Sequence, residues 1–154
     1  MEIRACAESD VPTVRALFAE YAAGLGIDLC FQQFDEELVG LPGAYAPPTG
    51  GLFIARDGEA PAGCVAFRRL GAGRCELKRL YVRSAFRGRG LGRLLACRAL
   101  EEAGAAGYSS AHLDTLPSMT GAIALYRALG FEPAEPHYHN PVPGALFFAK
   151  SLKA

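Results

Sequence analysis

Arg87-Gly88-Arg89-Gly90-Leu91-Gly92-Arg93 forms a glycine-rich turn between the apolar run Leu80-Tyr81-Val82 and an amphipathic segment that opens at Leu91. Glycines allow backbone N–H groups to approach a ligand closely, and the first turn of a helix leaves its N–H donors unpaired. The helix dipole favours negative charge at the same place. The three arginines add charge and bidentate donors that suit phosphate. The stretch therefore predicts a site for a diphosphate-bearing ligand.

Positive charge is concentrated around this turn in a chain whose formal net charge is zero. Residues 1–67 carry three Arg or Lys against ten Asp or Glu, whereas residues 68–98 carry ten against the single acid Glu76. A nucleic-acid surface usually brings interleaved aromatic residues and an overall basic domain. The neutral balance therefore argues against a nucleic-acid partner. The basic stretch of residues 68–98 either contributes to the anion site or forms a solvated face.

The length of 154 residues and the composition, 51% apolar and 21% charged, predict one globular domain over residues 1–154. No apolar run approaches the roughly 20 residues that cross a bilayer, and the first residues lack the core of a signal peptide. We therefore expect a cytoplasmic protein with no membrane partner. Five cysteines without a C-x-x-C pair predict buried free thiols in a reducing compartment. They are Cys6, Cys30, Cys64, Cys75 and Cys97.

Hydrophobic periodicity predicts an alternation of strands and helices. Strands are expected at Glu2–Cys6, Leu52–Ala55, Gly63–Leu70, Glu76–Val82, Ala111–Thr115 and Leu146–Ser151, with a further one starting at Phe131. Helices are expected after Asp10 as N-cap, at Phe31–Leu41, at 91–105 and at Ser118–Leu129. This order predicts an α/β fold, with a mixed, mostly antiparallel sheet of six to seven strands flanked by about four helices.

Two well-known phosphate loops do not match the glycine turn. A P-loop requires Lys-Ser or Lys-Thr after its glycines, and a dinucleotide-binding turn requires a glycine at the position of Arg93. As Arg87-x-x-Gly90-x-Gly92, the turn instead resembles the pyrophosphate motif of the GNAT superfamily of acetyl-CoA-dependent N-acetyltransferases. The segment Leu125-Tyr126-Arg127-Ala128-Leu129-Gly130-Phe131 is similar to the L-Y-x-x-x-G-F segment of the same family.

The resemblance, strongest over residues 74–132, implies a GNAT-like acyl-CoA N-acyltransferase fold with acetyl-CoA as co-substrate and no metal. It implies that the backbone N–H groups from Arg87 to Arg93 hold the coenzyme pyrophosphate. The backbone of Leu80–Val82 would pair with the amides of the pantetheine arm and would donate to the carbonyl oxygen. Many members carry an asparagine where this chain has Met119, so that contact is not carried over.

By the same resemblance, Tyr126 is the general acid that protonates the departing thiolate of coenzyme A. A phenol with a pKa of about 10 suits donation to a thiolate of similar basicity. The alternative is a core aromatic residue, because Tyr126 stands at helical spacing from Ala122 and Leu129.

Acyl transfer also needs a base, because an ammonium with a pKa of about 10 is protonated at pH 7. Glu76 is the first candidate. It stands eleven residues before Arg87, the offset of the catalytic glutamate in some histone-modifying members of the family. Burial on a strand is expected to raise its pKa. The alternative is an ion pair with one of the neighbouring cations Lys78, Arg79 and Arg74. Asp114 is the second candidate, with capping of the following helix as its alternative.

Three further side chains are candidates for the acceptor site. Arg79 is predicted to pair with a carboxylate of the acceptor, which favours an amino acid or a peptide-like substrate. His137 and His139 precede the last strand, in a segment that commonly borders the acceptor site in this family. They have no third ligand at metal spacing, so no zinc site is expected. They shape an acceptor pocket or face solvent.

The resemblance implies an N-acetyltransferase, and with these residues we expect it to move an acetyl group from acetyl-CoA to a primary amine of a small molecule by direct attack in a ternary complex. The small-molecule acceptor would be an amino acid or another metabolite amine. One alternative is a protein lysine or N-terminus, since the acidic N-terminal half would attract basic peptides. Another is a non-catalytic CoA-binding module. The sequence leaves open whether the protein forms a homodimer.

Overall fold

The computed structural model describes residues 1–26, 28–29 and 33–153. Seven strands lie in these ranges: β1 (Glu2–Ala5), β2 (Gly51–Asp57), β3 (Ala60–Gly71), β4 (Arg74–Val82), β5 (Ser110–Thr115), β6 (Glu132–Pro133) and β7 (Leu146–Ser151). Four α-helices accompany them: α1 (Val11–Leu25), α2 (Phe34–Gly40), α3 (Leu91–Ala105) and α4 (Thr120–Ala128). The 3-10 turns of the same ranges are η1 (Glu8–Asp10), η3 (Gly43–Tyr45) and η4 (Ser84–Phe86).

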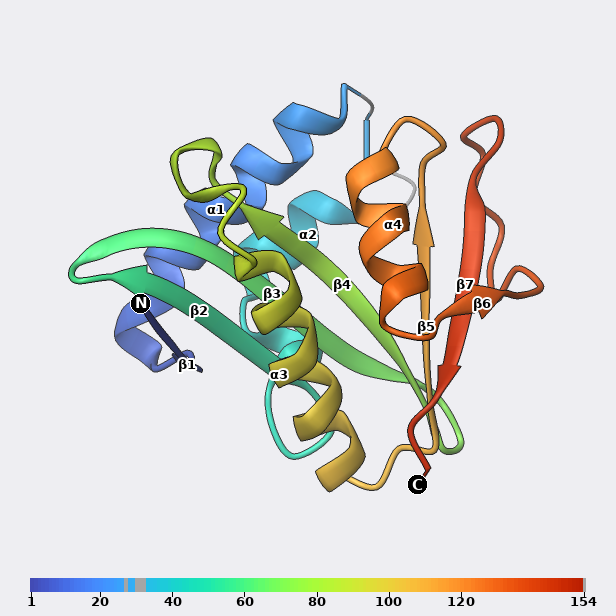
Figure 1. Cartoon of the computed structure of the whole chain (residues 1–154). Coiled ribbons are helices and arrows are strands. Elements are labelled where there is room, and N and C mark those ends of the chain that lie inside the picture. Colours follow the sequence, from blue (N-terminus) through green and yellow to red (C-terminus); the bar gives the residue numbers. More distant parts are fainter. Residues whose placement is uncertain (27, 30–32, 154) are drawn as a thin grey trace.

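The strands form one sheet in the order β1-β2-β3-β4-β5-β7-β6. Neighbouring strands are antiparallel except β4 and β5, which are parallel. The connection from β4 to β5 runs through the glycine turn and α3 (Figure 1). The predicted α/β fold, with its mostly antiparallel sheet and four flanking helices, is therefore confirmed for the described residues.

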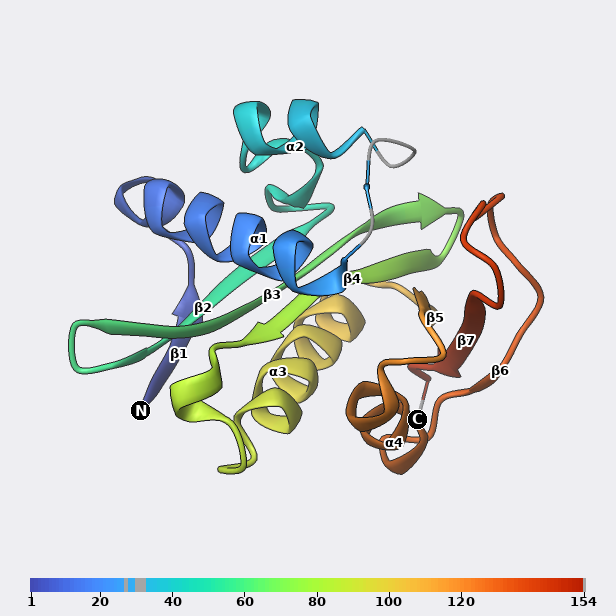
Figure 2. The same ribbon diagram turned by 90° about the horizontal axis from the view of Figure 1, so that it is seen from above.

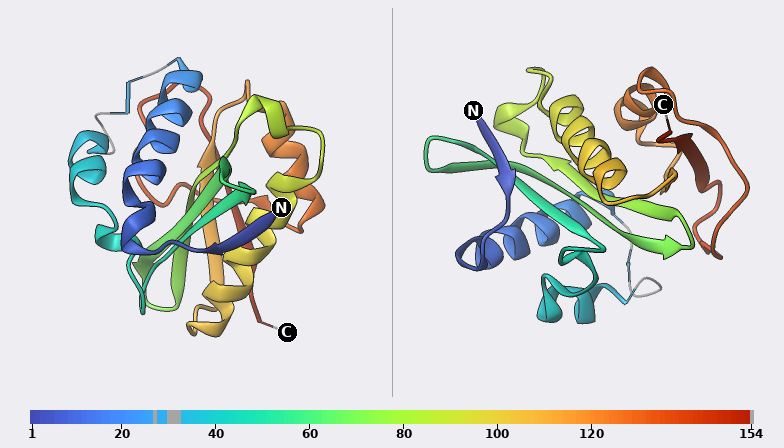
Figure 3. Two further views of the ribbon diagram at one scale, coloured as in Figure 1. Left: turned by 90° about the vertical axis from the view of Figure 1, so that its left-hand side faces the viewer. Right: turned by 90° about the horizontal axis from the view of Figure 1, so that it is seen from below.

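The helices cover both faces of the sheet, as Figures 2 and 3 show. α1 and α2 lie on one face, where Phe18 and Ile54 belong to one buried cluster. α3 and α4 lie on the other face, where Leu95 and Phe131 belong to a second cluster. Burying an apolar side chain of this size contributes about 1.5–3 kcal/mol. Both helix layers are therefore attached to the sheet between them by the packing of buried apolar side chains.

β4 and β5 separate partway along their length. Their backbone pairing stops at Glu76 and His112, and beyond this point the two strands diverge (Figure 1). A register shift in the β3–β4 pairing falls nearby, between Cys64 and Ala66, and Arg79 takes a left-handed φ of 60°. A bulge of this kind bends a strand and changes the direction of its side chains. The sheet consequently opens between the ends of β4 and β5.

The predicted elements are found, with shifts at their ends. The helix expected at Phe31–Leu41 is α2, which starts later, and residues 31 and 32 lie outside the described ranges. The helix expected at Ser118–Leu129 is α4, with Met119 as its N-cap. Among the described helices, none has the length and apolar character that a membrane span requires.

Four of the five cysteines lie in the described ranges, and these four are free thiols. Cys64 and Cys75 are buried as predicted, Cys6 and Cys97 are half-buried, and Cys30 lies outside the described residues. Burial raises the pKa of the Cys64 and Cys75 thiols. A raised pKa disfavours the thiolate, so neither residue is suited to carry an acyl group.

Candidate active site

The glycine turn begins a long helix, as predicted. Gly88 and Gly90 take left-handed φ values of 79° and 75°, a conformation that costs other residues roughly 1–2 kcal/mol. Gly90 is the N-cap of α3, and its carbonyl accepts a hydrogen bond from the Leu94 N–H at 3.1 Å. The N–H groups of the first helical turn have no acceptor within the helix and carry the positive end of its dipole. This is the geometry of a backbone anion site.

A cleft of about 700 Å³ lies beside this turn. Its walls come from the end of α1, the end of β4, the turn itself and the N-terminal part of α4. The volume is within the range of ligand and cofactor sites, about 300–1,000 Å³. The cleft gathers most of the residues predicted to bind the coenzyme, namely Leu80, Tyr81, Val82, Arg87, Gly88, Gly90, Leu91 and Gly92.

The three arginines of the turn do not all face the cleft. Arg87 lines it, and its Nε donates to the Val82 carbonyl at 2.9 Å, which ties the turn to the end of β4. The Arg89 guanidinium lies 5.7 Å from the ring centroid of Phe86, and Arg93 is exposed. Neither Arg89 nor Arg93 lines the cleft. The positive charge at the wall is therefore that of Arg87.

Tyr126 lies on α4 beside the opening between β4 and β5. Its buried ring packs edge to face against Phe131, with centroids 5.7 Å apart. It also lines a small cavity of about 40 Å³ that adjoins the cleft. Burial raises the pKa of the Tyr126 phenol above its ordinary value of 10, so the hydroxyl keeps its proton at neutral pH. The residue is at once part of the core and part of the site wall, and its role as the acid stays a prediction.

Glu76 is buried, but the prediction that its pKa is raised is wrong. Its carboxylate accepts hydrogen bonds from Arg68 Nε at 2.9 Å and from His137 Nε2 at 2.8 Å, and Lys78 Nζ lies 3.9 Å away. Burial alone raises the pKa of this carboxyl, but the His137 hydrogen bond and the charges of Lys78 and Arg68 lower it to about 2. The predicted rise does not occur, because these partners outweigh the burial.

Arg79 meets a carboxylate of the protein itself, which corrects the prediction that it meets the acceptor. Its Nε and Nη2 donate to the two carboxylate oxygens of Glu37 at 2.8 and 2.9 Å. The guanidinium also lies 5.0 Å from the ring centroid of Phe34, and the residue is 3% exposed. The sequence does not show that α2 folds over β4 and supplies this counter-ion.

Asp114 lines the small cavity together with Tyr126. Its Oδ2 accepts hydrogen bonds from the Tyr138 hydroxyl and from Asn140 Nδ2, the latter at 2.9 Å. The helix-cap alternative for Asp114 is wrong, since the N-cap of α4 is Met119. Sequence reasoning missed Tyr138 and Asn140. Both residues are sequence neighbours of the two candidate histidines, and the segment is unusually rich in aromatic and polar side chains for a loop. This composition is the feature that could have identified them.

The two histidines of this segment lie in different environments. The side chain of His137 is 4% exposed, with its ring centroid 5.2 Å from that of Phe147 and 6.0 Å from that of His112. His139 is exposed. Neither lines the cleft or the small cavity, so His137 supports the wall from behind and His139 faces solvent. Within the described ranges, no group of three His, Cys, Asp or Glu side chains is placed to hold a metal ion.

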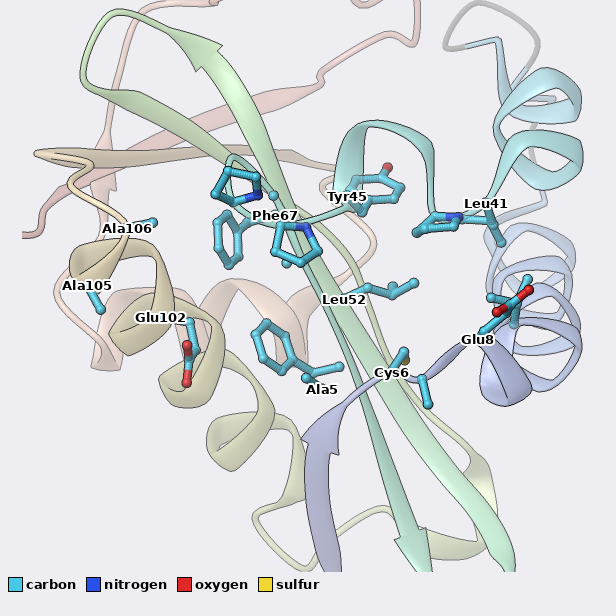
Figure 4. A pocket seen from close by; sticks show the side chains of 18 of the residues that line it. Ala5, Cys6, Glu8, Leu41, Tyr45, Leu52, Phe67, Glu102, Ala105 and Ala106 are labelled. Atoms are coloured by element: carbon cyan, nitrogen blue, oxygen red, sulfur yellow. The ribbon is translucent and has the colours of Figure 1, made fainter.

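A larger cavity, of about 890 Å³, lies at the other end of α3 (Figure 4). Its lining is mostly apolar and comes from the junction of β1 with α1, the segment before β2 and the last turn of α3. α3 has 15 residues, so its two ends are roughly 20 Å apart. None of the predicted site residues lines this cavity. Most of the predicted coenzyme-binding residues lie at the cleft instead, and Tyr126 and Asp114 line the small cavity beside it.

Residues 13–131 match the model of a protein family described as the Acetyltransferase (GNAT) family. The chain belongs to the GNAT acetyltransferase family. An uncharacterized N-acetyltransferase of Schizosaccharomyces pombe is 43% identical to this GNAT protein over 140 residues, which are 90% of this chain and 86% of that one. The family and this relative identify the protein as an acetyltransferase.

Solved structures of the family share the fold of this GNAT protein. An acetyltransferase from Staphylococcus aureus gives a TM-score of 0.82 at 17% identity and covers 99% of both chains. The yncA protein of Salmonella typhimurium, whose structure holds its cofactor acetyl-CoA, gives a TM-score of 0.71 at 20% identity. That likeness covers 100% of this chain and 95% of yncA. The acyl-CoA N-acyltransferase fold expected from the sequence is confirmed.

Proposed function

We propose that this GNAT protein transfers the acetyl group of acetyl-CoA to the primary amine of a small molecule within a ternary complex. The observation that carries the proposal is the continuity of the cleft at the glycine turn with the small cavity behind it. The two share the wall residues Tyr21, Leu25, Leu80 and Met119. The cleft offers a backbone anion site, and the cavity offers a buried phenol and a carboxylate. Coenzyme and acceptor would therefore meet at Tyr126.

Acetyl-CoA would lie with its pyrophosphate on the N–H groups of the turn and its pantetheine arm along Leu80–Val82. This part of β4 has no backbone pairing with β5, and the amides of pantetheine can pair with an open strand. Arg87 adds a positive charge at the wall of the cleft. The yncA protein, which shares the fold, binds acetyl-CoA, and this supports the same coenzyme here.

In the transfer step the amine nitrogen attacks the thioester carbonyl, and a backbone N–H of Leu80–Val82 stabilises the oxygen. As the C–N bond forms and the C–S bond breaks, sulfur takes the bonding electrons and a proton from the Tyr126 hydroxyl. The ammonium loses one proton to water before the attack. The proton that nitrogen loses afterwards restores Tyr126 through water, so one proton is released per turnover.

The carboxylates take different parts in this scheme. Asp114 faces the cavity and is placed to hold the attacking ammonium. Glu76, whose pKa of about 2 makes it a weak base, serves as the counter-ion of Arg68 and Lys78. The cavity is small, about 40 Å³, and Asn140, from the segment before β7, is part of its lining. A cavity of this size favours a small amine over a protein lysine or N-terminus.

The proposal is tested by thermal unfolding with and without acetyl-CoA, followed by a panel of amines in which free CoA is measured. A ligand that binds the native state raises the Tm with its concentration. We expect acetyl-CoA to do so, and we expect CoA release to require an amine. No rise in Tm would overturn the coenzyme site. A rise without release on any amine would favour a non-catalytic CoA-binding module.

A further inference from the structure

Asp114 lines the small cavity at a point where β4 and β5 have separated. β5 pairs with β4 only as far as His112, two residues before Asp114. Tyr126, the predicted acid, lines the same cavity. A hydrogen bond between an ammonium and a carboxylate is strong, but it depends on direction. The orientation of the Asp114 carboxylate therefore decides how well it holds an acceptor in this cavity.

Two side chains of the segment before β7 bond this carboxylate. The Tyr138 hydroxyl and Asn140 Nδ2 both donate to Oδ2 of Asp114, the latter at 2.9 Å. Asn140 Nδ2 also lies 3.3 Å from the Tyr138 hydroxyl oxygen, so the three groups contact one another. Within the part of the chain that the structure describes, Oδ1 of Asp114 accepts no hydrogen bond. One oxygen is thus occupied, and the other is left for a ligand.

Both donors are themselves held in place. The Tyr138 ring packs against Phe147 of β7, with centroids 5.7 Å apart, and against His137, with centroids 5.3 Å apart. The Oδ1 atom of Asn140 accepts a hydrogen bond from the Val142 N–H at 2.9 Å. Neither donor can turn away from the carboxylate without losing these contacts, so the orientation of the carboxylate is fixed by the tertiary structure.

The two donors differ in their relation to the cavity. Asn140 is part of its lining, whereas Tyr138 lines neither the cavity nor the cleft. The hydroxyl of Tyr138 therefore acts on a ligand in the cavity through Asp114. This makes Tyr138 the cleaner probe of what the orientation of the carboxylate contributes.

We propose that Tyr138 and Asn140 are positioning residues, which orient Asp114 so that its Oδ1 receives the ammonium of the acceptor. The inference rests on the proposed function, in which Asp114 holds this ammonium, and it assigns the segment before β7 a part in acceptor binding. The terminal torsion of an aspartate is broad, so a carboxylate without these donors would rotate. In the proposed scheme the ammonium loses its charge before the attack. The orientation of Asp114 should therefore affect the binding of the acceptor more than the chemical step.

The test measures initial rates of CoA release for Tyr138→Phe, a variant that keeps the ring and removes the hydroxyl. Ethylamine, propylamine, glycine and alanine are compared at saturating acetyl-CoA, and the acceptor with the highest kcat/KM in the wild type is used for every variant. We expect the KM for this acceptor to rise about fivefold or more, because a hydrogen bond to a charged group is lost. The kcat and the KM for acetyl-CoA should change less than twofold. An unchanged acceptor KM would overturn the role of Tyr138.

Asn140→Ala removes the other donor and gives a second, independent measurement. It should raise the KM for the same acceptor in the same way, with protection by acetyl-CoA retained. Tyr108→Phe is the matched control. Its hydroxyl donates to the Thr49 carbonyl at 2.5 Å, and the residue lines neither the cleft nor the small cavity. This control should leave the acceptor KM within twofold of the wild-type value.

A double-mutant cycle separates positioning from a purely structural role. In an Asp114→Ala background there is no carboxylate left to orient. Tyr138→Phe should then change kcat/KM for the acceptor less than twofold further, with kcat/KM taken from the initial slope at low acceptor concentration. A structural role would give the same loss in both backgrounds. Equal losses would therefore overturn the positioning of Asp114 by Tyr138.

The proposed function and this inference fail in different ways. Absence of protection by acetyl-CoA in the wild type contradicts the proposed function itself. Protection together with CoA release, but with an acceptor KM that neither Tyr138→Phe nor Asn140→Ala changes, overturns the positioning role and leaves the acetyltransferase standing. Protection without release on any of the four acceptors also overturns it, because a carboxylate oriented for a small ammonium should accept one of them. The coenzyme site remains in that case.

Discussion

His137 Nε2 lies 2.8 Å from Oε2 of Glu76, which joins the segment before β7 to the first part of β4 through a buried hydrogen bond. The two side chains are 4% and 1% exposed. Since the same carboxylate also meets Arg68 and Lys78, it is the negative centre of a cluster that links β3, β4 and the segment before β7. A carboxylate in this position should matter more for stability than for proton transfer.

Glu76→Gln should lower the free energy of unfolding at pH 7 by about 3–5 kcal/mol, because it removes the buried carboxylate that Lys78 and Arg68 share. The pKa of Glu76 is lowered from 4.5 to about 2 in the folded protein. Its contribution is therefore complete above the unfolded value and is lost as the pH falls toward 2. Urea unfolding between pH 7 and pH 3 should show a smaller pH dependence in the variant. An unchanged dependence would contradict this, and Glu101→Gln on the exposed face of α3 is the control.

Tyr126→Phe should reduce kcat about 10²–10⁴-fold and leave protection by acetyl-CoA intact, since a general acid contributes a factor of this size. The ring contact with Phe131 at 5.7 Å does not involve the hydroxyl, so the fold should be retained. Initial rates of CoA release, with the Tm measured in parallel, separate the two effects. A kcat equal to that of the wild type would assign Tyr126 to the core alone.

Gly90→Ala should weaken acetyl-CoA binding about tenfold, since alanine disfavours the left-handed φ of 75° by roughly 1–2 kcal/mol. A Cβ at this position meets nothing within 4 Å, so the effect is one of backbone conformation. Gly104→Ala is a matched control at the far end of α3, where φ is not left-handed and a Cβ also meets nothing within 4 Å. Titration of the Tm with acetyl-CoA should separate the two variants, and equal affinities would argue against the turn as the anion site.

The glycine turn and Tyr126 could be predicted because their signals are local. Each motif lies in one continuous stretch, and the left-handed conformation of Gly88 and Gly90 is one that glycine adopts at no steric cost. The order of strands and helices along the chain followed from the same kind of signal, through hydrophobic periodicity. The fold and the glycine-rich motif could therefore be predicted from the sequence.

The hydrogen bonds and ion pairs of the charged site residues could not be predicted from the sequence, because their partners come from distant parts of the chain. Glu76 bonds His137, 61 residues later, and Arg79 bonds Glu37, 42 residues earlier. The bulge at Arg79 gives a left-handed φ to a residue type that rarely adopts one. A pattern of apolar residues predicts which side chains are buried but not which charges meet. From its burial alone, the pKa of Glu76 was expected to be raised. In the folded protein, its hydrogen-bonding and charged partners lower it.

The Arg79–Glu37 pair provides a final prediction, on what attaches α2 to the sheet. A double-mutant cycle of Arg79→Met and Glu37→Gln should give a coupling energy of about 1–3 kcal/mol, because the side chains are only 2% and 12% exposed and are joined by two hydrogen bonds. Arg83 and Glu20 form a comparison pair at 3.1 Å whose side chains are 40% and 36% exposed. Their coupling should stay below about 1 kcal/mol and should fall in high salt. If urea unfolding gave equal couplings for the two pairs, burial would not be what strengthens the contact between α2 and β4.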